Sequence, residues 1–441
     1  MNKDNTVKSE VEISENMNGF NTTLNTDEIL GNGLSPLGDF NNDGIPDIVI
    51  GSRSSDGATH AGAIYVCFLD TNGTVKSFKK ISKSTGGISS SLISSRSNFG
   101  IAVDTIGDMD GNGHMDLIIG GYTDPTGGSN TGAAWIVYLE SDGTCKNAVK
   151  IDKNTSILGP LLDVGGRFGL ATAGLRDIDG DGVRDIAISS YTNSIGGTNM
   201  GALYVLRMNA NGTVKAVAKN TAIKNANFIN TNNYYFGIDI EYLGINAATG
   251  NSQLGMGCFA DDAQGNDRGA IVLADLDSVG NIISWKKYST AKINDDYTIN
   301  NEDLFGSSIA LIEKRNNEIK LAVGARGDDD GGSRAGAVYI ITIADTCIVE
   351  CDINANFTFD ASCQNIPVEF TNSTTSADTQ IFWKYLFGDG DSVVGVPNPN
   401  HHYSDTGCYD VTLIVGNSGE NDVCLDTITQ QVCINEYFQV S

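Results

Sequence analysis

Histidine and the common catalytic motifs are scarce in this sequence. Only four histidines occur among 441 residues. The patterns G-x-S-x-G, H-E-x-x-H and C-x-x-C are absent, which excludes a nucleophile elbow, a helical zinc-protease site and a thioredoxin-like dithiol. A pair of carboxylates for glycoside cleavage is the one catalytic arrangement that the composition leaves open. The best acidic clusters of the chain are assigned to cation sites below, so we predict that the protein is not an enzyme.

Basic residues and long apolar runs are also few. The chain has 28 Lys and Arg against 54 Asp and Glu, a formal net charge of −26. Such a charge repels a phosphate backbone, so we predict no nucleic-acid partner. No apolar stretch is long enough to cross a bilayer, and residues 2–14 lack the apolar core of a signal peptide. We predict no direct membrane insertion and expect the export signal to be absent from this chain.

Aspartate, in contrast, is abundant and arranged in short ladders. Residues 175–190 place four Asp on alternate positions around a glycine turn. Two carboxylates about 4 Å apart repel by roughly 4 kcal/mol at an effective dielectric near 20, so we expect a divalent cation between them. The pattern D-x-[DN]-x-[DN]-G supplies calcium ligands in this way. The predicted ligands are Asp177, Asp179, Asp181, the Val183 carbonyl and Asp185.

Two earlier stretches repeat the ladder. Their predicted ligands are Asp39, Asn41, Asp43, the Ile45 carbonyl and Asp47 in the first loop, and Asp108, Asp110, Asn112, the His114 carbonyl and Asp116 in the second. The twelfth position counted from Asp177 is Ile188, not the bidentate Glu of a helix-loop-helix calcium site. The apolar run after each ladder predicts a buried strand instead. An acidic hairpin turn is the alternative for one loop alone, but three copies favour about three Ca²⁺ sites.

The ladders belong to longer internal repeats. Five units open with Leu30-Gly31, Phe99-Gly100, Phe168-Gly169, Phe236-Gly237 and Phe305-Gly306, at steps of 69, 69, 68 and 69 residues. Each unit contains an opening strand, the loop, an apolar strand, a Gly-rich turn, a "GAIYV"-like strand and a more polar fourth strand. Four such strands make one blade of a β-propeller. The fourth and fifth units lack the ladder, so the sequence supports three cation sites.

The amino terminus is predicted to close the ring of blades. Thr6-Val7-Lys8-Ser9 matches Thr74-Val75-Lys76-Ser77, and Ile13-Ser14 matches Ile81-Ser82, both at an offset of 68. The first residues therefore resemble a fourth strand, which would pair beside the last strand of the fifth unit and leave no open sheet edge. We expect residues 1–345 to form a five-bladed propeller. A larger ring that is truncated upstream is the alternative.

The composition changes after residue 345. Residues 346–441 are predicted to form an immunoglobulin-like β-sandwich, because alternating apolar strands are separated by turn signals. Six of the nine cysteines lie here. Strand placement favours the pairs Cys363–Cys424, Cys408–Cys433 and Cys347–Cys351 among the fifteen possible pairings, with some buried thiols as the alternative. Cys67 and Cys258 lie in apolar strands of the first region and are expected to be free.

Both regions are similar to known families. The "FG" openings and the acidic ladders resemble the FG-GAP repeats of integrin α subunits. The strings "FGDG", "PNHHY" and "GCYDVTL" resemble the PKD domain of surface proteins, with Tyr385 where that family commonly has Trp. The first resemblance implies an all-β propeller whose loops bind calcium on one face, usually with seven blades rather than five. The second implies an immunoglobulin-like spacer.

The predicted function is adhesion or recognition outside the cell. Calcium loops of this type fill at extracellular concentrations, and a cysteine-dense sandwich suits an oxidising compartment. We expect a propeller with a binding face whose ligand is a surface protein or a glycan. One alternative is a structural subunit of a surface filament or sheath, which would bind copies of itself. Another is a non-catalytic accessory region of a secreted polysaccharide-degrading enzyme.

Two other motifs have ordinary explanations. Arg326-Gly327-Asp328 ("RGD") precedes the last "GAVYI" strand and is interpreted as a chance match. Asp389 and Asp391 are assigned to a hairpin turn rather than to a cation site. We expect His401 to pack or to form a hydrogen bond.

Overall fold

The chain divides into two compact units, residues 1–343 and residues 344–441. The computed structural model describes residues 9–25, 28–53, 56–194, 198–221, 234–246, 249–261, 266–289, 299–315, 318–330, 332–344, 354–360, 366–375, 381–417 and 425–435. Strands dominate both units, and the short 3₁₀ turn η1 (Gly159–Leu161) interrupts one connection. The predicted all-β fold is confirmed.

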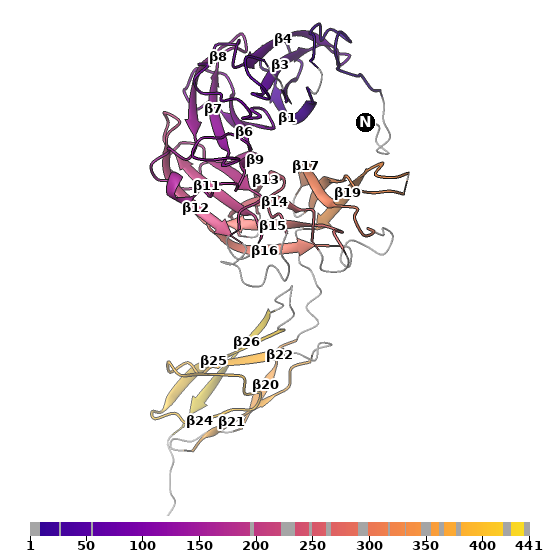
Figure 1. Cartoon of the computed structure of the whole chain (residues 1–441). Helices are drawn as coiled ribbons and strands as arrows, with labels where there is room; N and C mark the ends of the chain where they lie inside the picture. Colours follow the sequence, from indigo (N-terminus) through magenta and orange to yellow (C-terminus); the bar gives the residue numbers. More distant parts are fainter. Residues whose placement is uncertain are drawn as a thin grey trace, which may run out of the picture. The chain divides into compact units, whose positions relative to one another are not determined.

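The first unit consists of sheets that follow an arc in chain order (Figure 1). Blade 1 contains β1 (Leu30–Gly38), β2 (Asp47–Ser52), β3 (Ala63–Leu69) and β4 (Val75–Ser82), and blade 2 contains β5 (Ala102–Gly107), β6 (Asp116–Gly121), β7 (Ala133–Leu139) and β8 (Cys145–Ile151). Blade 3 contains β9 (Phe168–Gly174), β10 (Ile186–Ser190), β11 (Ala202–Met208) and β12 (Val214–Thr221), and blade 4 contains β13 (Ile240–Ile245), β14 (Ser252–Cys258), β15 (Ala270–Leu276) and β16 (Ile282–Tyr288). The described strands of blade 5 are β17 (Phe305–Arg315), β18 (Glu318–Ala325) and β19 (Ala337–Ala344). Every sheet pairs its strands antiparallel in chain order, as predicted.

Close backbone contacts between blades explain the repeated "FG" and "GA" dipeptides. Phe99 and Phe168 bridge in parallel to Gly62 and Gly132 of the preceding blades. Gly132 has a φ of +87°, and a Cβ there would lie 1.9 Å from the Phe168 carbonyl oxygen. Only glycine fits this approach. The dipeptides therefore fix the position of each blade against the next.

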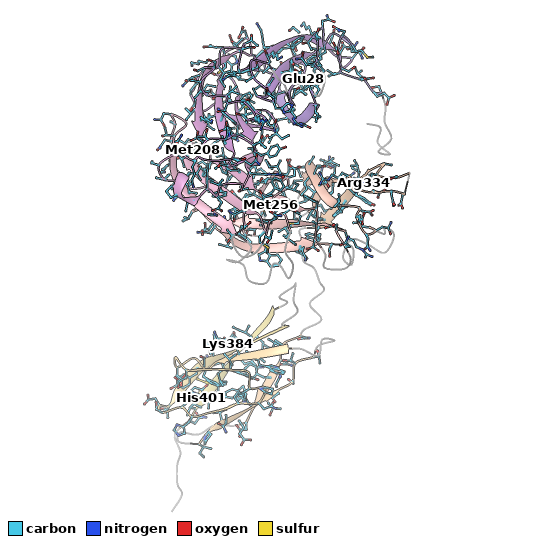
Figure 2. The ribbon with its side chains drawn as sticks, in the orientation of Figure 1. Glu28, Met208, Met256, Arg334, Lys384 and His401 are labelled. Atoms are coloured by element: carbon cyan, nitrogen blue, oxygen red, sulfur yellow. A yellow bond between two sulfur atoms is a disulfide. The ribbon has the colours of Figure 1, made fainter. Side chains whose placement is uncertain are left out.

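Apolar side chains fill the space between neighbouring blades. Met208 lies fully buried in the cluster between blades 2 and 3, and Met256 in the cluster between blades 3 and 4 (Figure 2). Every residue of β6 and β7 is buried. This explains why the central strands are apolar throughout rather than alternating, because both faces of each sheet are covered.

A carboxylate on the innermost strand of blade 2 joins three blades. Asp104 on β5 accepts hydrogen bonds from the Ser35 hydroxyl of β1 (3.0 Å) and from the Gly174 N–H of β9 (2.8 Å). Burial raises the pKa of Asp104, and these donors lower it only in part. These two hydrogen bonds connect the first strands of blades 1, 2 and 3.

Blade 4 uses two carboxylates in the same way. Glu241 accepts a hydrogen bond from the Leu311 N–H of β17 (3.1 Å), and Asp239 accepts one from the Ile309 N–H (2.8 Å). Burial, with the charge of Asp104 nearby, raises the pKa of Glu241 to about 7 and that of Asp239 to about 6. The contact between blades 4 and 5 therefore depends on carboxylates that resist ionisation.

The described amino-terminal residues differ from the predicted closing strand. Residues 9–25 form no strand. Phe20 and Ile13 pack on Tyr65 and Val75, over the face of blade 1 that does not contact blade 2. Ile81, the counterpart of Ile13 in the repeat, likewise packs against the following blade, so this contact is compatible with the predicted closing position. Residues 6–8 lie outside the described part of the chain, so ring closure stays a prediction.

The second unit is a two-sheet sandwich. One sheet contains β20 (Phe357–Phe359), β21 (Val368–Asn372) and β24 (Asn400–His401), and the other contains β22 (Ile381–Leu386), β23 (Ser392–Val394), β25 (Gly407–Asn417) and β26 (Leu425–Ile434). Tyr385 is fully buried in the core and donates a hydrogen bond to the Pro397 carbonyl (3.2 Å). Its hydroxyl therefore has a partner at the position where PKD domains commonly have Trp.

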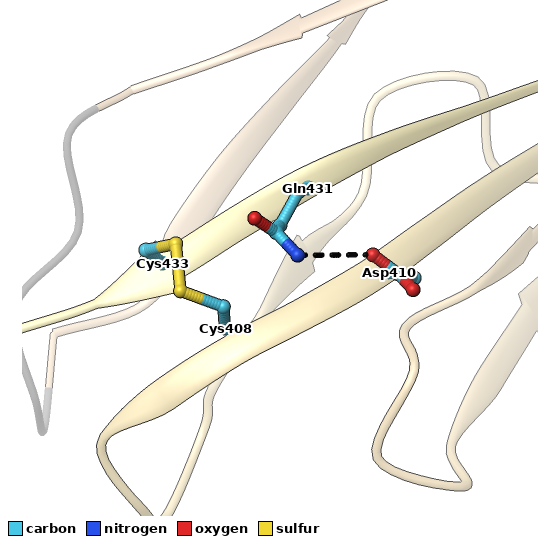
Figure 3. Close-up of a disulfide and its surroundings, with 4 residues drawn as sticks. All are labelled: Cys408, Asp410, Gln431 and Cys433. Atoms are coloured by element: carbon cyan, nitrogen blue, oxygen red, sulfur yellow. Dashed lines mark hydrogen bonds between the residues drawn. A yellow bond between two sulfur atoms is a disulfide. The ribbon is translucent and has the colours of Figure 1, made fainter.

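A disulfide links the last two strands. Cys408 and Cys433 are register partners on β25 and β26 and are bonded to each other (Figure 3). This pairing is confirmed. The residues of the other two predicted pairs, Cys347, Cys351, Cys363 and Cys424, lie outside the described part of the chain. Cys67 and Cys258 are buried and free, as predicted. Cys145, for which no prediction was made, is also buried and free.

Candidate metal sites

The three acidic loops join the first strand of a blade to the second, and each begins with an Asp that organises the backbone. In the third loop, Asp177 accepts hydrogen bonds from the N–H groups of Gly180 (2.7 Å), Asp181 (3.2 Å) and Gly182 (2.6 Å). Burial would raise the pKa of Asp177, but these donors together lower it. Asp39 and Asp108 accept the equivalent bonds in the first and second loops. The loops are therefore folded around their first predicted ligand.

The last Asp of each ladder is fully buried and ties the loop to the third strand. Asp185 accepts hydrogen bonds from the N–H groups of Ile178 and Met208, both at 2.9 Å. Burial, with the charges of Asp179 and Asp177, raises the pKa of Asp185 to about 6. Asp116 has the same two bonds and a pKa of about 6, and Asp47 has the same bonds and a raised pKa. A bound cation would offset this cost of ionisation.

The middle positions bring the carboxylates together in two of the three loops. Ligand atoms of Asp108, Asp110 and Asp116 lie within 4.8 Å of one another, and so do those of Asp177, Asp179 and Asp181. The Oδ1 atom of Asp179 is buried and has no hydrogen-bond partner among the described residues. A buried carboxylate oxygen without a donor costs free energy, and a cation removes that cost. The residues present in the third loop therefore fit a hard divalent ion.

The first loop is less acidic. Asn41 occupies its second ligand position and donates a hydrogen bond to Asp43 (3.1 Å). The residues predicted to ligate through their carbonyls, Ile45, His114 and Val183, donate their N–H groups to Asp43, Asn112 and Asp181. These bonds hold the middle of each loop in a turn. Ligation by the three carbonyls stays a prediction.

In blades 1, 2 and 3 a lysine from the fourth strand reaches the ladder, a contact that was not predicted from the sequence. Lys76 lies 3.1 Å from Asp43, and Lys146 lies 2.8 Å from Asp110. Lys215 contacts both Asp179 (2.9 Å) and Asp181 (2.6 Å). The signal was present, because all three lysines stand two residues after a Thr in the same hairpin of the repeat. Such exposed pairs stabilise little but compete for the carboxylates.

Blades 4 and 5 replace the ladder, as predicted. Gln253 stands at the repeat position of Asp185 and donates a hydrogen bond to Asp275 on the third strand (3.3 Å). Asn246 donates to the same buried carboxylate (2.9 Å). In blade 5 the equivalent position is Lys320. Blade 4 thus uses amide donors to stabilise the loop between its first and second strands.

Two other acidic groups have partners within the protein. In the second unit Asp389, Asp391 and His401 lie close together, but the His401 Nε2 atom is 2.6 Å from Asp389 and its ring stacks on Phe387. In the first unit Asp328 of the "RGD" string is buried and accepts a hydrogen bond from the Tyr339 hydroxyl (2.9 Å). A buried Asp328 is not presented to a receptor.

Family models match separate parts of the chain. The FG-GAP repeat model matches residues 31–67, a second FG-GAP repeat model matches residues 298–341, and the PKD domain model matches residues 353–432. The chain carries FG-GAP repeats and a PKD domain. No helix among the described residues is long and apolar enough to cross a membrane.

Individual proteins resemble shorter stretches. Human integrin alpha-6 is 30% identical over 160 residues, which is 36% of this chain and 12% of the human protein. Chicken (Gallus gallus) integrin alpha-6 is 28% identical over 172 residues, 36% of this chain and 13% of that protein. The chain thus spans about an eighth of the length of these relatives. The PKD1 domain of the Vibrio cholerae metalloprotease PrtV is 25% identical over 19% of this chain and 96% of that domain, with a TM-score of 0.17, which is too low to bear on the fold.

Proposed function

We propose that this chain is a calcium-binding adhesion or recognition module of the cell exterior. In this proposal the FG-GAP blades present a binding face, the PKD domain acts as a spacer, and neither is catalytic. The buried, unpartnered Oδ1 atom of Asp179 is the observation that carries the calcium assignment. Similarity of the repeats to those of integrin alpha-6 supports the adhesive role.

The calcium in this proposal is structural. Each ion would be held by the side chains of one ladder and would link the hairpin of the first two strands to the end of the third strand, through Asp47, Asp116 or Asp185. It would offset the repulsion within the ladder. Filling a site to one hundred times its Kd adds about 2.7 kcal/mol to the free energy of unfolding.

Thermal unfolding with millimolar calcium, and then with excess chelator, tests the proposal. We expect the melting temperature of the first unit to fall by several degrees on chelation and to recover with calcium. Magnesium at the same concentration should restore less, because it demands a smaller octahedral site. Asp179→Asn should reduce the calcium effect, whereas Asp142→Asn, at an exposed hairpin outside the ladders, should leave it unchanged. An identical transition with and without chelator would contradict the proposal.

One observation favours a structural subunit as the second candidate. Val338 and Ile340 on β19, the outermost described strand of blade 5, are 68% and 42% exposed. Apolar side chains on an outer strand favour pairing with another chain. Light scattering over a range of protein concentrations distinguishes the candidates, since a strictly monomeric chain would argue against a filament subunit.

A further inference from the structure

A pocket lies at the end of the blades opposite the acidic ladders. The ladders follow the first strand of each blade, and because the strands are antiparallel, the loops after the second strand are at the other end. The pocket has a volume of about 570 Å³ and is lined by residues from blades 2 to 5, including Arg326. This volume lies in the range of ligand sites. This pocket was not predicted from the sequence.

Two repeat positions supply its principal side chains. The first position directly follows the second strand and holds Arg53, Tyr122, Tyr191, Phe259 and Arg326 in the five units. The second position directly precedes the "FG" phenylalanine and holds Asn98, Arg167, Tyr235 and Leu304 in the last four units. All but Arg53, Asn98 and Leu304 line the pocket. The repeat frame is constant, while the chemistry at these positions differs from blade to blade.

These side chains form a continuous row, which we call the aromatic–arginine stack: Tyr122, Arg167, Tyr191, Tyr235, Phe259 and Arg326. The Arg167 guanidinium lies 5.9 Å from the Tyr122 ring centre and 5.5 Å from that of Tyr191. The rings of Tyr235 and Phe259 stack in parallel at 5.0 Å. Arg326 lies 4.7 Å from the Phe259 ring centre. The stack therefore has guanidinium groups near both ends and aromatic rings between them.

The backbone holds two members of the stack in a strained conformation. Arg167 has a φ of +59° and Tyr235 a φ of +54°. Asn98 and Leu304, at the same repeat position, have φ values of +53° and +57°. This region is unusual for bulky residues, and such outliers cluster at binding sites. The position in the repeat imposes the positive φ. In blades 3 and 4 this position holds Arg167 and Tyr235, which line the pocket.

The two arginines of the stack differ from two lysines at the same end of the blades. Lys150 pairs with Asp124 (2.9 Å), and Lys287 pairs with Asp261 (2.9 Å). No carboxylate lies within ion-pair distance of Arg167 or Arg326 among the described residues. The Arg167 guanidinium donates one hydrogen bond to the Tyr191 hydroxyl. In a chain of net charge −26, its remaining N–H groups and those of Arg326 are available for an anion.

We propose that the aromatic–arginine stack binds an acidic oligosaccharide through its carboxylates. Guanidinium forks recognise planar carboxylates in a bidentate manner, and the flat rings between them suit sugar rings with an apolar face. A ligand that spans the stack must carry anionic groups at intervals along a chain. A nucleic-acid strand also offers rings and anions, but the net charge of −26 repels a polyanion of that density. The inference rests on the proposed recognition function and names the class of partner.

The test uses the full chain in calcium buffer and a hyaluronan octasaccharide, a carboxylate-bearing sugar chain, with binding measured by calorimetry. We expect measurable binding that is lost when the carboxylates are reduced to alcohols. Arg167→Asn keeps a residue that the repeat already accepts at this φ, and it should weaken binding at least about tenfold. Arg326→Gln should act similarly. Arg53→Gln is the matched control, because Arg53 occupies the repeat position of Arg326 outside the pocket.

Several outcomes would overturn the inference. They are equal binding of the reduced sugar, unchanged affinity in Arg167→Asn, or an acidic aromatic peptide that binds with the same arginine dependence while the sugar does not. Melting temperatures of all variants exclude misfolding as the cause. The calcium titration on the same samples separates the two proposals. Absence of sugar binding by a calcium-stabilised chain defeats this inference alone, whereas absence of a calcium effect defeats the proposed metal sites alone.

Discussion

Blades 3 and 4 share the hairpin of their first two strands but stabilise the loop of that hairpin in different ways. In blade 3 the buried Asp185 faces the ladder of Asp177, Asp179 and Asp181, where one carboxylate oxygen has no partner among the described residues. In blade 4 a single buried carboxylate, Asp275, is surrounded by amide donors. The fold of a blade therefore does not require the ladder. Where the ladder is present, we expect the stability of this loop to depend on a bound cation.

The largest expected effect on stability comes from a substitution that makes the loop of blade 4 resemble that of blade 3. Gln253→Asp places a second buried carboxylate beside Asp275, without the remaining ligands of a ladder. An uncompensated buried charge costs roughly 3–5 kcal/mol. Because Lys314, 3.0 Å from Gln253, offsets part of this cost, we expect the free energy of unfolding to fall by about 3 kcal/mol. Chemical denaturation measures it, with Gln253→Asn as the neutral control. Rescue of Gln253→Asp by calcium would show that blade 4 does form a cation site.

Removal of the buried anchor in blade 3 is expected to have the next largest effect. Asp185→Asn leaves one of two buried N–H groups, of Ile178 or Met208, without an acceptor, which costs about 2 kcal/mol. It also removes a predicted ligand, so the calcium-dependent gain in stability should shrink. Denaturation with and without calcium measures both effects. Asp275→Asn in blade 4 is the matched control and should leave the calcium-dependent part intact. An equal calcium-dependent gain in stability in Asp185→Asn and Asp275→Asn would contradict the assignment of a cation site to blade 3 and not to blade 4.

The pH dependence tests the carboxylates between blades 4 and 5. The pKa of Glu241 is about 7 in the folded chain and lower when unfolded, so the folded state binds the proton more tightly. Its stabilisation is complete below the unfolded pKa and is lost as pH rises through 7. In chelator, the free energy of unfolding of Glu241→Gln should exceed that of the wild type at pH 8 and match it at pH 4. A difference in free energy of unfolding between the two proteins that stays constant from pH 4 to pH 8 would contradict this assignment.

The smallest effect is expected from the lysine over the third ladder. Lys215→Met removes a cation that competes for Asp179 and Asp181, so calcium affinity should rise by less than about tenfold. Calorimetric titration measures the change. Lys79→Met is the control, because Lys79 pairs with Asp142 away from the ladders. A fall in affinity would mean that Lys215 positions the ligands instead of competing with calcium.

Much of the propeller could be predicted because its signals are local. The "FG" and "GA" dipeptides, repeated every 68 or 69 residues, mark a backbone contact that only glycine allows, so one period defines each blade. Each ladder also lies within nine residues. The lysines were missed because Lys215 lies 34 residues from Asp181 and meets it only through the pairing of the blade's strands. The closing strand stays a prediction, because residues 6–8 lie outside the described part of the chain and residues 9–25 form no strand.

The sequence by itself determined the all-β repeat frame, the three ladders and the β-sandwich, since each depends on the spacing of residues close together in the chain. Only the tertiary structure decided which groups from different blades meet. The aromatic–arginine stack joins Tyr122 to Arg326 across more than two hundred residues, and Asp104 joins three blades. Such contacts depend on how rigid blades pack through their apolar faces, and no local pattern carries that information.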